Sequence, residues 1–276
     1  MTTLFLFLAA TLRILAIGNS FSQDAVEQNL YEICAAAGQQ VIIGNMYIPG
    51  CSIDKHVRCM ENDSPSYDYR KIGLDGVKVK TGNYRLSQAI EDEPWDVVSV
   101  QQSSGYSGQY GSYAKLSVLV SWIREKAPQA KIVFHRTWAY SPESTHKHYA
   151  FYGNDQLTMW NAIVDASERA CRDCGIETII PAGDAIQAAR STSLGPDLTR
   201  DGYHLDLTIG RYIAAAAWFE ALTGKSILRN RYCPEGISKQ DLKTARKAVH
   251  SVRFAPSRRF APPIHMAMGG HGFWRA

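Results

Sequence analysis

Two short segments of the chain combine residue types that could carry out nucleophilic chemistry. In Gly18-Asn19-Ser20, a glycine two residues before a serine permits a sharp turn that exposes the hydroxyl at the start of a helix. Backbone N–H groups and the positive helix end would then lie beside that hydroxyl, and both stabilise a developing oxyanion. Gly-x-Ser alone is a weak signal, because most such triplets are ordinary turns. Ser20 is thus a candidate nucleophile that still needs a base.

Asp201-Gly202-Tyr203-His204 supplies a candidate base late in the chain, directly ahead of a predicted helix. An acid three residues before a histidine can accept the imidazole Nδ1–H, which leaves Nε2 facing outward as a general base. The alternative is that Asp201 caps the helix and that His204 is incidental. The pair could activate Ser20 only if the fold brings the two ends of the chain together.

Two further segments could provide donors for an oxyanion. Gly50 could place a backbone N–H close to a ligand, although a plain turn glycine is an equal interpretation. Gln101 and Gln102 close an apolar segment, and alternation along a strand would bring only one of them to the site. We favour Gln102, because it lies one residue further out, where the strand gives way to a loop. The alternative is that Gln102 only holds the backbone of residues 103–105.

Aromatic residues that follow predicted strands are the expected substrate contacts. Tyr106 lies in a loop rich in Gly and Tyr, and His135 and Trp138 follow another apolar segment. Such residues provide a wet aromatic surface, which suits an acetylated sugar better than a long acyl chain. Gln101 is a further candidate substrate contact on the same edge.

Short apolar segments alternate with longer amphipathic ones, which is typical of βαβ units and a parallel sheet with helices on both faces. Strands are expected at 13–17, 40–46, 96–101, 131–135 and 177–180, and helices at 24–37, 112–126, 155–172, 185–190, 208–223 and 238–253. Residues 67–80 are expected to form a β-hairpin inserted on the surface. Ligands bind beyond the carboxyl ends of the strands in such sheets, so the functional residues should follow the strands.

In this order, the segments GNSFS, GCSIDKH, WDVVSVQQSS and DGYHLD resemble the four blocks of the SGNH (GDSL-like) hydrolase superfamily over about residues 13–223. They look like a bacterial branch described mostly as a domain of unknown function, and carbohydrate acetylesterases lie nearby in the superfamily. The resemblance implies a catalytic triad of Ser20, Asp201 and His204.

The resemblance also implies an oxyanion hole formed by Ser20, Gly50 and a glutamine. The chain departs from the superfamily pattern in two places. Asn19 stands where the superfamily has Asp, which affects the turn but not the nucleophile. The Asn of the third block is missing, so Gln101 or Gln102 must replace it.

The fold implied by the resemblance is a flavodoxin-like three-layer α/β/α sandwich, with residues 13–255 as one hydrolase domain. The implied activity is that of a serine esterase, which hydrolyses short-chain acyl esters through an acyl-enzyme and needs no metal or organic cofactor. O-acetyl groups on carbohydrate are the expected substrate. Two alternatives stay open: a general short-chain esterase or thioesterase, and a catalytically silent carbohydrate-binding relative.

Composition and charge limit the class of protein and the partners that can be expected. The 276 residues are 45% hydrophobic and 20% charged, which is ordinary for a globular protein with a full core. Residues 225–276 hold eleven Lys and Arg against two acids, but no nucleic-acid motif accompanies them. We therefore expect no nucleic-acid partner, and a solvated helix followed by a poorly ordered tail at 256–276.

The apolar residues 1–12 are too short to span a bilayer as a helix, so no stable membrane insertion is expected. They are interpreted as a signal remnant, which would indicate a secreted or periplasmic protein, or as an extension leading into the first strand, which would indicate a cytoplasmic one. The compartment and the oligomeric state stay open.

Other residues with reactive side chains are expected to have no catalytic or metal-binding role. Cys171-x-x-Cys174 has redox spacing, but it ends a predicted helix where a redox motif should begin one. His146-x-His148 lies in a polar loop without carboxylate or cysteine neighbours, so no metal site is expected there. Asp24 is assigned to a helix cap or to the surface.

Overall fold

The computed structural model describes residues 10–252. The predicted tail at 256–276 and most of the predicted N-terminal segment at 1–12 lie outside the described residues. Leu12, from the end of that segment, begins the first strand. The prediction of an extension leading into this strand can therefore be followed only at residues 10–12.

Seven strands form one sheet in the order β4-β3-β2-β1-β5-β6-β7. They are β1 (Leu12–Gly18), β2 (Val41–Tyr47), β3 (Tyr67–Ile72), β4 (Lys78–Tyr84), β5 (Val97–Val100), β6 (Lys131–His135) and β7 (Thr178–Ile180). The strands β1, β2, β5, β6 and β7 pair in parallel, and each overlaps a strand predicted from the sequence. The carboxyl ends of these parallel strands therefore meet at one edge of the sheet.

The predicted hairpin is present as β3 and β4, but its position was predicted wrongly. β3 pairs antiparallel with β2, with Ile43 opposite Ile72, so the hairpin extends the sheet. Tyr67, Tyr69 and Ile72 turn their side chains into the core, whereas β4 is exposed along nearly its whole length. The lysines at both ends of Lys78–Lys80 are typical of an edge strand that avoids pairing with other chains.

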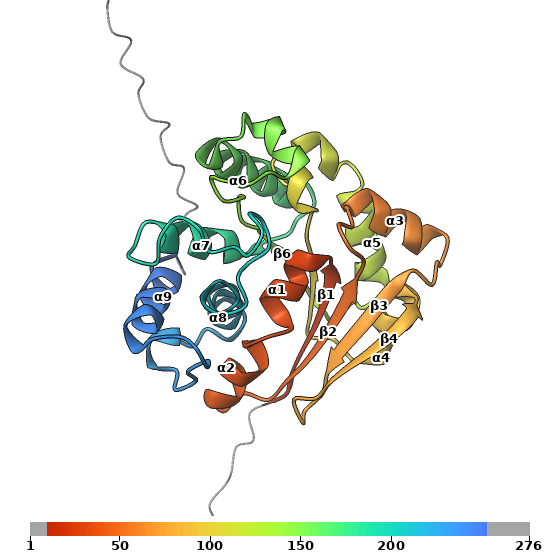
Figure 1. Cartoon of the computed structure of the whole chain (residues 1–276). Helices are drawn as coiled ribbons and strands as arrows, with labels where there is room; N and C mark the ends of the chain where they lie inside the picture. The colour runs from red at the N-terminus through yellow and green to blue at the C-terminus, as the bar shows by residue number, and fades with distance from the viewer. Residues whose placement is uncertain (1–9, 253–276) are drawn as a thin grey trace, which may run out of the picture.

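Helices cover both faces of the sheet and make the predicted three-layer sandwich (Figure 1). They are α1 (Ser20–Val26), α2 (Leu30–Ala36), α3 (Ile53–Glu61), α4 (Leu86–Asp92), α5 (Leu116–Lys126), α6 (Gln156–Asp173), α7 (Ala182–Arg190), α8 (Ile209–Thr223) and α9 (Lys239–Val252). Ile14 and Ala16 of β1 pack with α1, α2, α7, α8 and α9, whereas Leu15 and Ile17 pack with α3, α4 and α5. Residues of α6 contribute to both cores.

The helix predicted at 24–37 is divided in two. Asn29 has a φ of 69° between α1 and α2, a left-handed conformation that asparagine tolerates better than most residues. α1 also begins four residues earlier than predicted, at Ser20. The candidate nucleophile therefore lies in the first turn of a short helix, directly after β1.

The basic C-terminal helix is confirmed as α9 with a solvated face. Leu242, Ala245 and Val249 are buried against the core, while Lys239 and Lys243 are exposed. Across residues 10–252, no helix combines the length and apolar character needed to cross a membrane.

Candidate active site

Ser20 is positioned by the tight connection between β1 and α1. Asn19 caps α1, and its side-chain oxygen accepts a hydrogen bond from the Phe21 N–H at 2.9 Å. Gly18 must be a glycine, because a Cβ there would lie 2.5 Å from the Ser22 Oγ and 3.0 Å from the Gln101 Cδ. The glycine thus permits the close packing that holds Ser20 at the edge of the sheet.

A continuous chain of hydrogen bonds joins Ser20 to His204 and Asp201. The His204 Nε2 lies 2.8 Å from the Ser20 Oγ, and the His204 Nδ1 lies 2.6 Å from the Asp201 Oδ2. The other oxygen of Asp201 accepts the backbone N–H of His204 at 2.8 Å. This geometry presents Nε2 to the hydroxyl as a proton acceptor, while the Nδ1–H donates a hydrogen bond to the carboxylate.

The carboxylate of Asp201 is held in its ionised form. Burial alone would raise the pKa of Asp201, but hydrogen bonds from the side chain and backbone of His204 outweigh that effect and lower it. An ionised acid beside Nδ1 stabilises the imidazolium that forms when His204 takes a proton. His204, supported by Asp201, can therefore take the Ser20 proton while Ser20 attacks an electrophile.

Two backbone N–H groups lie in the loops around Ser20. In the part of the chain that the structure describes, the N–H groups of Ser20 and Gly50 donate no hydrogen bond. Gly50 has a φ of 58°, a left-handed conformation that favours glycine. The Asn19 Nδ2 donates to the Cys51 carbonyl at 2.9 Å and so ties the Gly50 loop to the Ser20 loop. Both N–H groups are available to a ligand at this edge.

Behind Ser20, a buried polar network joins three strand ends. The Gln101 Nε2 donates to the Asn19 Oδ1 at 2.8 Å, and the Gln101 Oε1 lies 2.8 Å from the His135 Nδ1. Burial lowers the pKa of His135 to about 3, so the neutral ring donates its Nδ1–H to Gln101. Asn19 is used as both donor and acceptor, which an aspartate could not be. This double role gives a physical reason for the departure from the superfamily pattern.

The hydrogen bonds of the Gln102 side chain contradict its predicted oxyanion role. Its Nε2 donates to the carbonyl and to the Oγ of Ser112, at 2.9 and 3.0 Å. Its Oε1 accepts the N–H groups of Ile53 and Ser103, at 3.0 and 2.8 Å. Both amide hydrogens are therefore engaged. The side chain holds the loop that follows β5, which is the alternative role expected from the sequence.

The prediction that His135, Trp138 and Gln101 contact substrate is also contradicted. His135 and Trp138 are 0% exposed and Gln101 is 2% exposed. Trp138 stacks on Phe21 at a centroid distance of 4.3 Å and donates its Nε1–H to the Tyr203 carbonyl at 2.8 Å. These side chains support the active-site loops from beneath because α8 and the loops themselves cover them. Tyr106, in contrast, is 39% exposed.

The sequence predicts a cap or surface position for Asp24, but its side chain is buried, with 0% exposed. Its carboxylate accepts the Leu205 N–H at 2.9 Å and pairs with Arg200 at 3.3 Å and Arg211 at 2.5 Å. Burial raises the pKa of Asp24, and the two guanidinium groups oppose that rise. Asp24 therefore clamps the helix of Ser20 to the loop of His204. The available signal was its spacing, since a residue four positions after Ser20 lies on the same helix face.

A second loop packs directly on the Asp201–His204 segment. Gly202 has a φ of 86°, and a Cβ there would lie 2.9 Å from the Ser144 Cα. The Tyr203 ring lies between His204 and His146, at centroid distances of 4.1 and 4.8 Å.

Within residues 10–252, no group of three His, Cys, Asp or Glu side chains is arranged to hold a metal ion.

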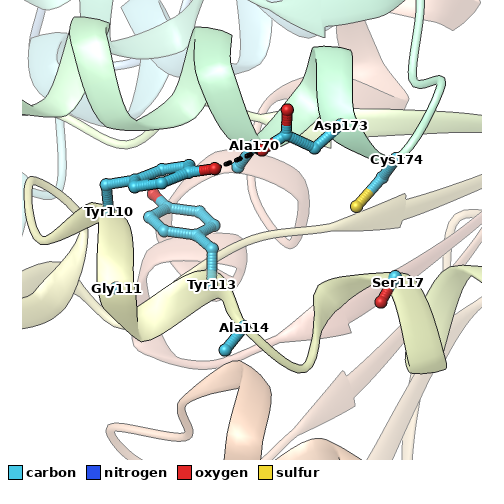
Figure 2. A pocket seen from close by; sticks show the side chains of 8 residues that line it. All are labelled: Tyr110, Gly111, Tyr113, Ala114, Ser117, Ala170, Asp173 and Cys174. Atoms are coloured by element: carbon cyan, nitrogen blue, oxygen red, sulfur yellow. Dashed lines mark hydrogen bonds between the residues drawn. The ribbon is translucent and has the colours of Figure 1, made fainter.

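A separate cavity of about 350 Å³ lies between α5, α6 and the 3₁₀ turn η2 (Tyr110–Tyr113) (Figure 2). The Tyr110 side chain points toward Asp173, and its hydroxyl donates a hydrogen bond to that carboxylate. The Arg169 guanidinium stacks on the Tyr110 ring, 3.7 Å from its centroid. Cys174 also lines this cavity and carries a free thiol. None of Ser20, Asp201 and His204 lines it, so this cavity is distinct from the candidate active site.

The chain matches a family model described as "Domain of unknown function (DUF4886)" over residues 13–252. A DUF4886 family protein from Bacteroides uniformis is 47% identical, with a TM-score of 0.89, and the match covers 91% of this chain and 98% of that one. A candidate SGNH hydrolase from Slackia heliotrinireducens is 20% identical, with a TM-score of 0.52 over 77% of this chain and 99% of its own. A lipase/acylhydrolase from Enterococcus faecalis is 13% identical, with a TM-score of 0.50 over 77% and 96%. A comparison with curated proteins gave no match. The chain therefore belongs to the DUF4886 family and has the fold of the SGNH hydrolases, as the sequence resemblance predicted.

Proposed function

We propose that the protein is a serine esterase that hydrolyses short-chain acyl esters, in particular O-acetyl groups on carbohydrate. The observation that carries this proposal is the hydrogen-bonded chain from Asp201 through His204 to Ser20. These three hydrogen-bonded side chains lie beyond the carboxyl ends of the parallel strands, where open α/β sheets bind their ligands. It has the order and geometry that acyl transfer to a serine requires.

In the proposed reaction, the His204 Nε2 takes the Ser20 proton while the Oγ attacks the ester carbonyl. The N–H groups of Ser20 and Gly50 stabilise the oxyanion, and His204 then donates its proton to the leaving alcohol. The acyl group stays on the Ser20 Oγ. Water attacks it with His204 again as base, and the Ser20 hydroxyl is restored as the carboxylic acid leaves.

The packing beneath Ser20 supports a short acyl group. Phe21 and Trp138, the large apolar side chains there, stack on each other and are 1% and 0% exposed. They are already buried, so they offer no open apolar surface to a long acyl chain. We expect a higher kcat/KM for p-nitrophenyl acetate and propionate than for the octanoate.

The first experiment tests the nucleophile. Ser20→Ala should lower kcat on p-nitrophenyl acetate by about 10⁴-fold or more, as triad substitutions do in other serine hydrolases. A fluorophosphonate probe should label the parent protein and not Ser20→Ala. Ser117→Ala is the matched control, because Ser117 is an exposed serine in the separate cavity. Labelling that survives in Ser20→Ala would exclude Ser20 as the nucleophile.

The second experiment compares substrates on the parent protein. Release of acetate from acetylated xylan, together with hydrolysis of p-nitrophenyl acetate, is the result expected of a carbohydrate esterase. Hydrolysis of p-nitrophenyl esters alone would favour the general short-chain esterase or thioesterase. Binding of xylan without any hydrolysis would indicate the silent carbohydrate-binding relative.

A further inference from the structure

Five aromatic and imidazole rings form a continuous series that begins at the catalytic His204. We call this series the aromatic rim, and its members are Tyr203, His146, His148, Phe151 and Tyr106. Successive centroid distances are 4.1 Å from His204 to Tyr203, 4.8 Å to His146, 5.2 Å to His148 and 5.0 Å to Phe151. Tyr106 lies beside His148 at 4.8 Å and so widens the outer end.

The backbone around the aromatic rim is fitted to these rings. A Cβ at Gly105 would lie 2.1 Å from the His148 Nδ1, so only glycine lets the imidazole lie against this loop. The rings of His148 and Phe151 are nearly parallel, with an interplanar angle of 12°. The Gln102–Ser112 hydrogen bonds continue to the Tyr106 carbonyl, which accepts the Ser112 Oγ–H at 3.0 Å. The rim is therefore supported from both of the loops that form it.

The outer rings are exposed although they are apolar. Phe151 is 51% exposed and Tyr106 is 39% exposed, while His146, His148 and Tyr203 are partly buried. Exposed aromatic side chains that lie together, beside a reactive group, are typical of a surface that binds a ligand. They present flat faces together with polar edges, which can pack on one side of a ligand and hydrogen-bond it at the edge.

The charge of the aromatic rim further limits the ligand. Burial lowers the pKa of His146 and of His148, and the neighbouring Lys147 adds to the effect in both. Both imidazoles are therefore neutral at neutral pH. The rings are tilted against one another, with interplanar angles of 63° between Tyr203 and His146 and 66° between His146 and His148, so the rim offers both ring faces and polar N–H and O–H edges. A neutral surface of this kind matches the apolar faces and hydroxyl groups of uncharged sugar rings. It matches a fatty acyl chain less well, since such a chain gains nothing from polar edges.

We propose that the aromatic rim binds the sugar residues of an oligosaccharide whose acetyl group reaches Ser20. This inference rests on the proposed function and adds the residues that select the substrate. Beyond Tyr203 the rim continues through His146, His148 and Phe151, so it offers contacts to sugar residues other than the one that carries the acetyl group. We therefore expect an oligosaccharide to bind more tightly than a free monosaccharide.

Binding without turnover gives the first test. Ser20→Ala protein is titrated by calorimetry with xylotetraose, mannotetraose and cellotetraose, and with xylose, mannose and glucose. We expect at least one tetrasaccharide to bind and its monosaccharide to bind far more weakly. Phe151→Ala and Tyr106→Ala, each added to Ser20→Ala, should weaken that binding about tenfold, the scale of a lost aromatic contact. Leu74→Ala is the matched control, because Leu74 is an apolar side chain of similar exposure, 52%, outside the rim.

Kinetics give the second test. In Phe151→Ala with an intact Ser20, KM for acetylated xylo-oligosaccharide should rise about tenfold while kcat changes much less, because the lost contact is made by the bound sugar throughout. An unchanged KM, together with no binding of any tetrasaccharide to Ser20→Ala, would overturn the role of the aromatic rim. A rise in KM for p-nitrophenyl octanoate instead would assign the rings to an acyl chain and would also overturn it. Failure of the proposed function looks different, since the parent protein would then neither hydrolyse p-nitrophenyl acetate nor react with fluorophosphonate.

Discussion

Gln101 and Gln102 are neighbours in the chain, yet they serve opposite sides of the candidate active site. Gln101 joins a buried network with Asn19 and His135 directly behind Ser20. Gln102 hydrogen-bonds Ser112 and thereby holds the loop of Tyr106. Successive side chains of an extended segment point to opposite sides, so two identical residue types acquire different roles.

The comparison separates two kinds of region. The buried network consists of side chains that are at most 2% exposed, and it fixes the backbone around Ser20. The aromatic rim consists of partly or largely exposed rings on loops that follow the strands. Rigid, buried groups can orient reacting atoms, whereas exposed rings can contact a substrate far from the reacting bond. We therefore expect substitutions behind Ser20 to act on kcat and substitutions under the rim to act on KM.

Among substitutions that test this comparison, the largest effect on kcat is expected for Gln101→Ala. This change removes the hydrogen bonds to Asn19 and His135 and frees the capping residue of α1 to move. A displacement of about 1 Å at a reacting group can lower kcat about 10²-fold, and we expect a loss on this scale with p-nitrophenyl acetate. Because the pKa of His135 is about 3, His135 stays neutral at working pH, and the pH profile of kcat should keep its shape. A profile that shifts would show that the network moves a proton instead of positioning Ser20.

A smaller effect is expected for Asn19→Asp, which restores the residue usual in the superfamily. Aspartate keeps the acceptor for the Phe21 N–H but loses the donor to the Cys51 carbonyl. A carboxylate would then face a carbonyl oxygen, and the Gly50 loop would lose one of its ties to Ser20. We expect kcat to fall about tenfold, which corresponds to one hydrogen bond. Asn83→Asp on β4 is the control, and an unchanged kcat in Asn19→Asp would show that this tie is not needed.

The smallest effect on kcat is expected for Gln102→Ala. This change leaves the Ile53 and Ser103 N–H groups without their side-chain acceptor, so thermal unfolding should shift by a few degrees, as for a loss of about 1–3 kcal/mol. KM for acetylated xylo-oligosaccharide should rise, because the loop of Tyr106 is no longer held. If Gln102→Ala lowers kcat on p-nitrophenyl acetate more than Gln101→Ala does, the two roles are exchanged.

Local patterns predicted the parallel core of the fold. The apolar segments that became β1, β2, β5, β6 and β7 are short and bounded by turn residues, and the residues between them have helical periodicity. Short-range signals were insufficient elsewhere. The break at Asn29 depends on a left-handed conformation that asparagine only tolerates, and its side chain accepts a hydrogen bond from Tyr232, far along the chain. The sequence indicated the hairpin of β3 and β4, but it did not indicate that β3 would pair with β2.

The sequence by itself determined which residue types follow which strands, and so the pairing of an early Ser20 with a late Asp-x-x-His could be predicted. Only the tertiary structure decided which side chains reach the surface. Trp138 is closed in by Tyr203, which is 65 residues away, and Gln101 is bound to Asn19, which is 82 residues away. Burial and hydrogen-bond partners at such separations depend on how whole elements pack, because the chain alone carries no local pattern that records which distant group will cover a side chain. The same reasoning explains Asp24. The sequence around it indicates only a cap or surface acid, whereas in the fold it is buried and pairs with Arg200 and Arg211.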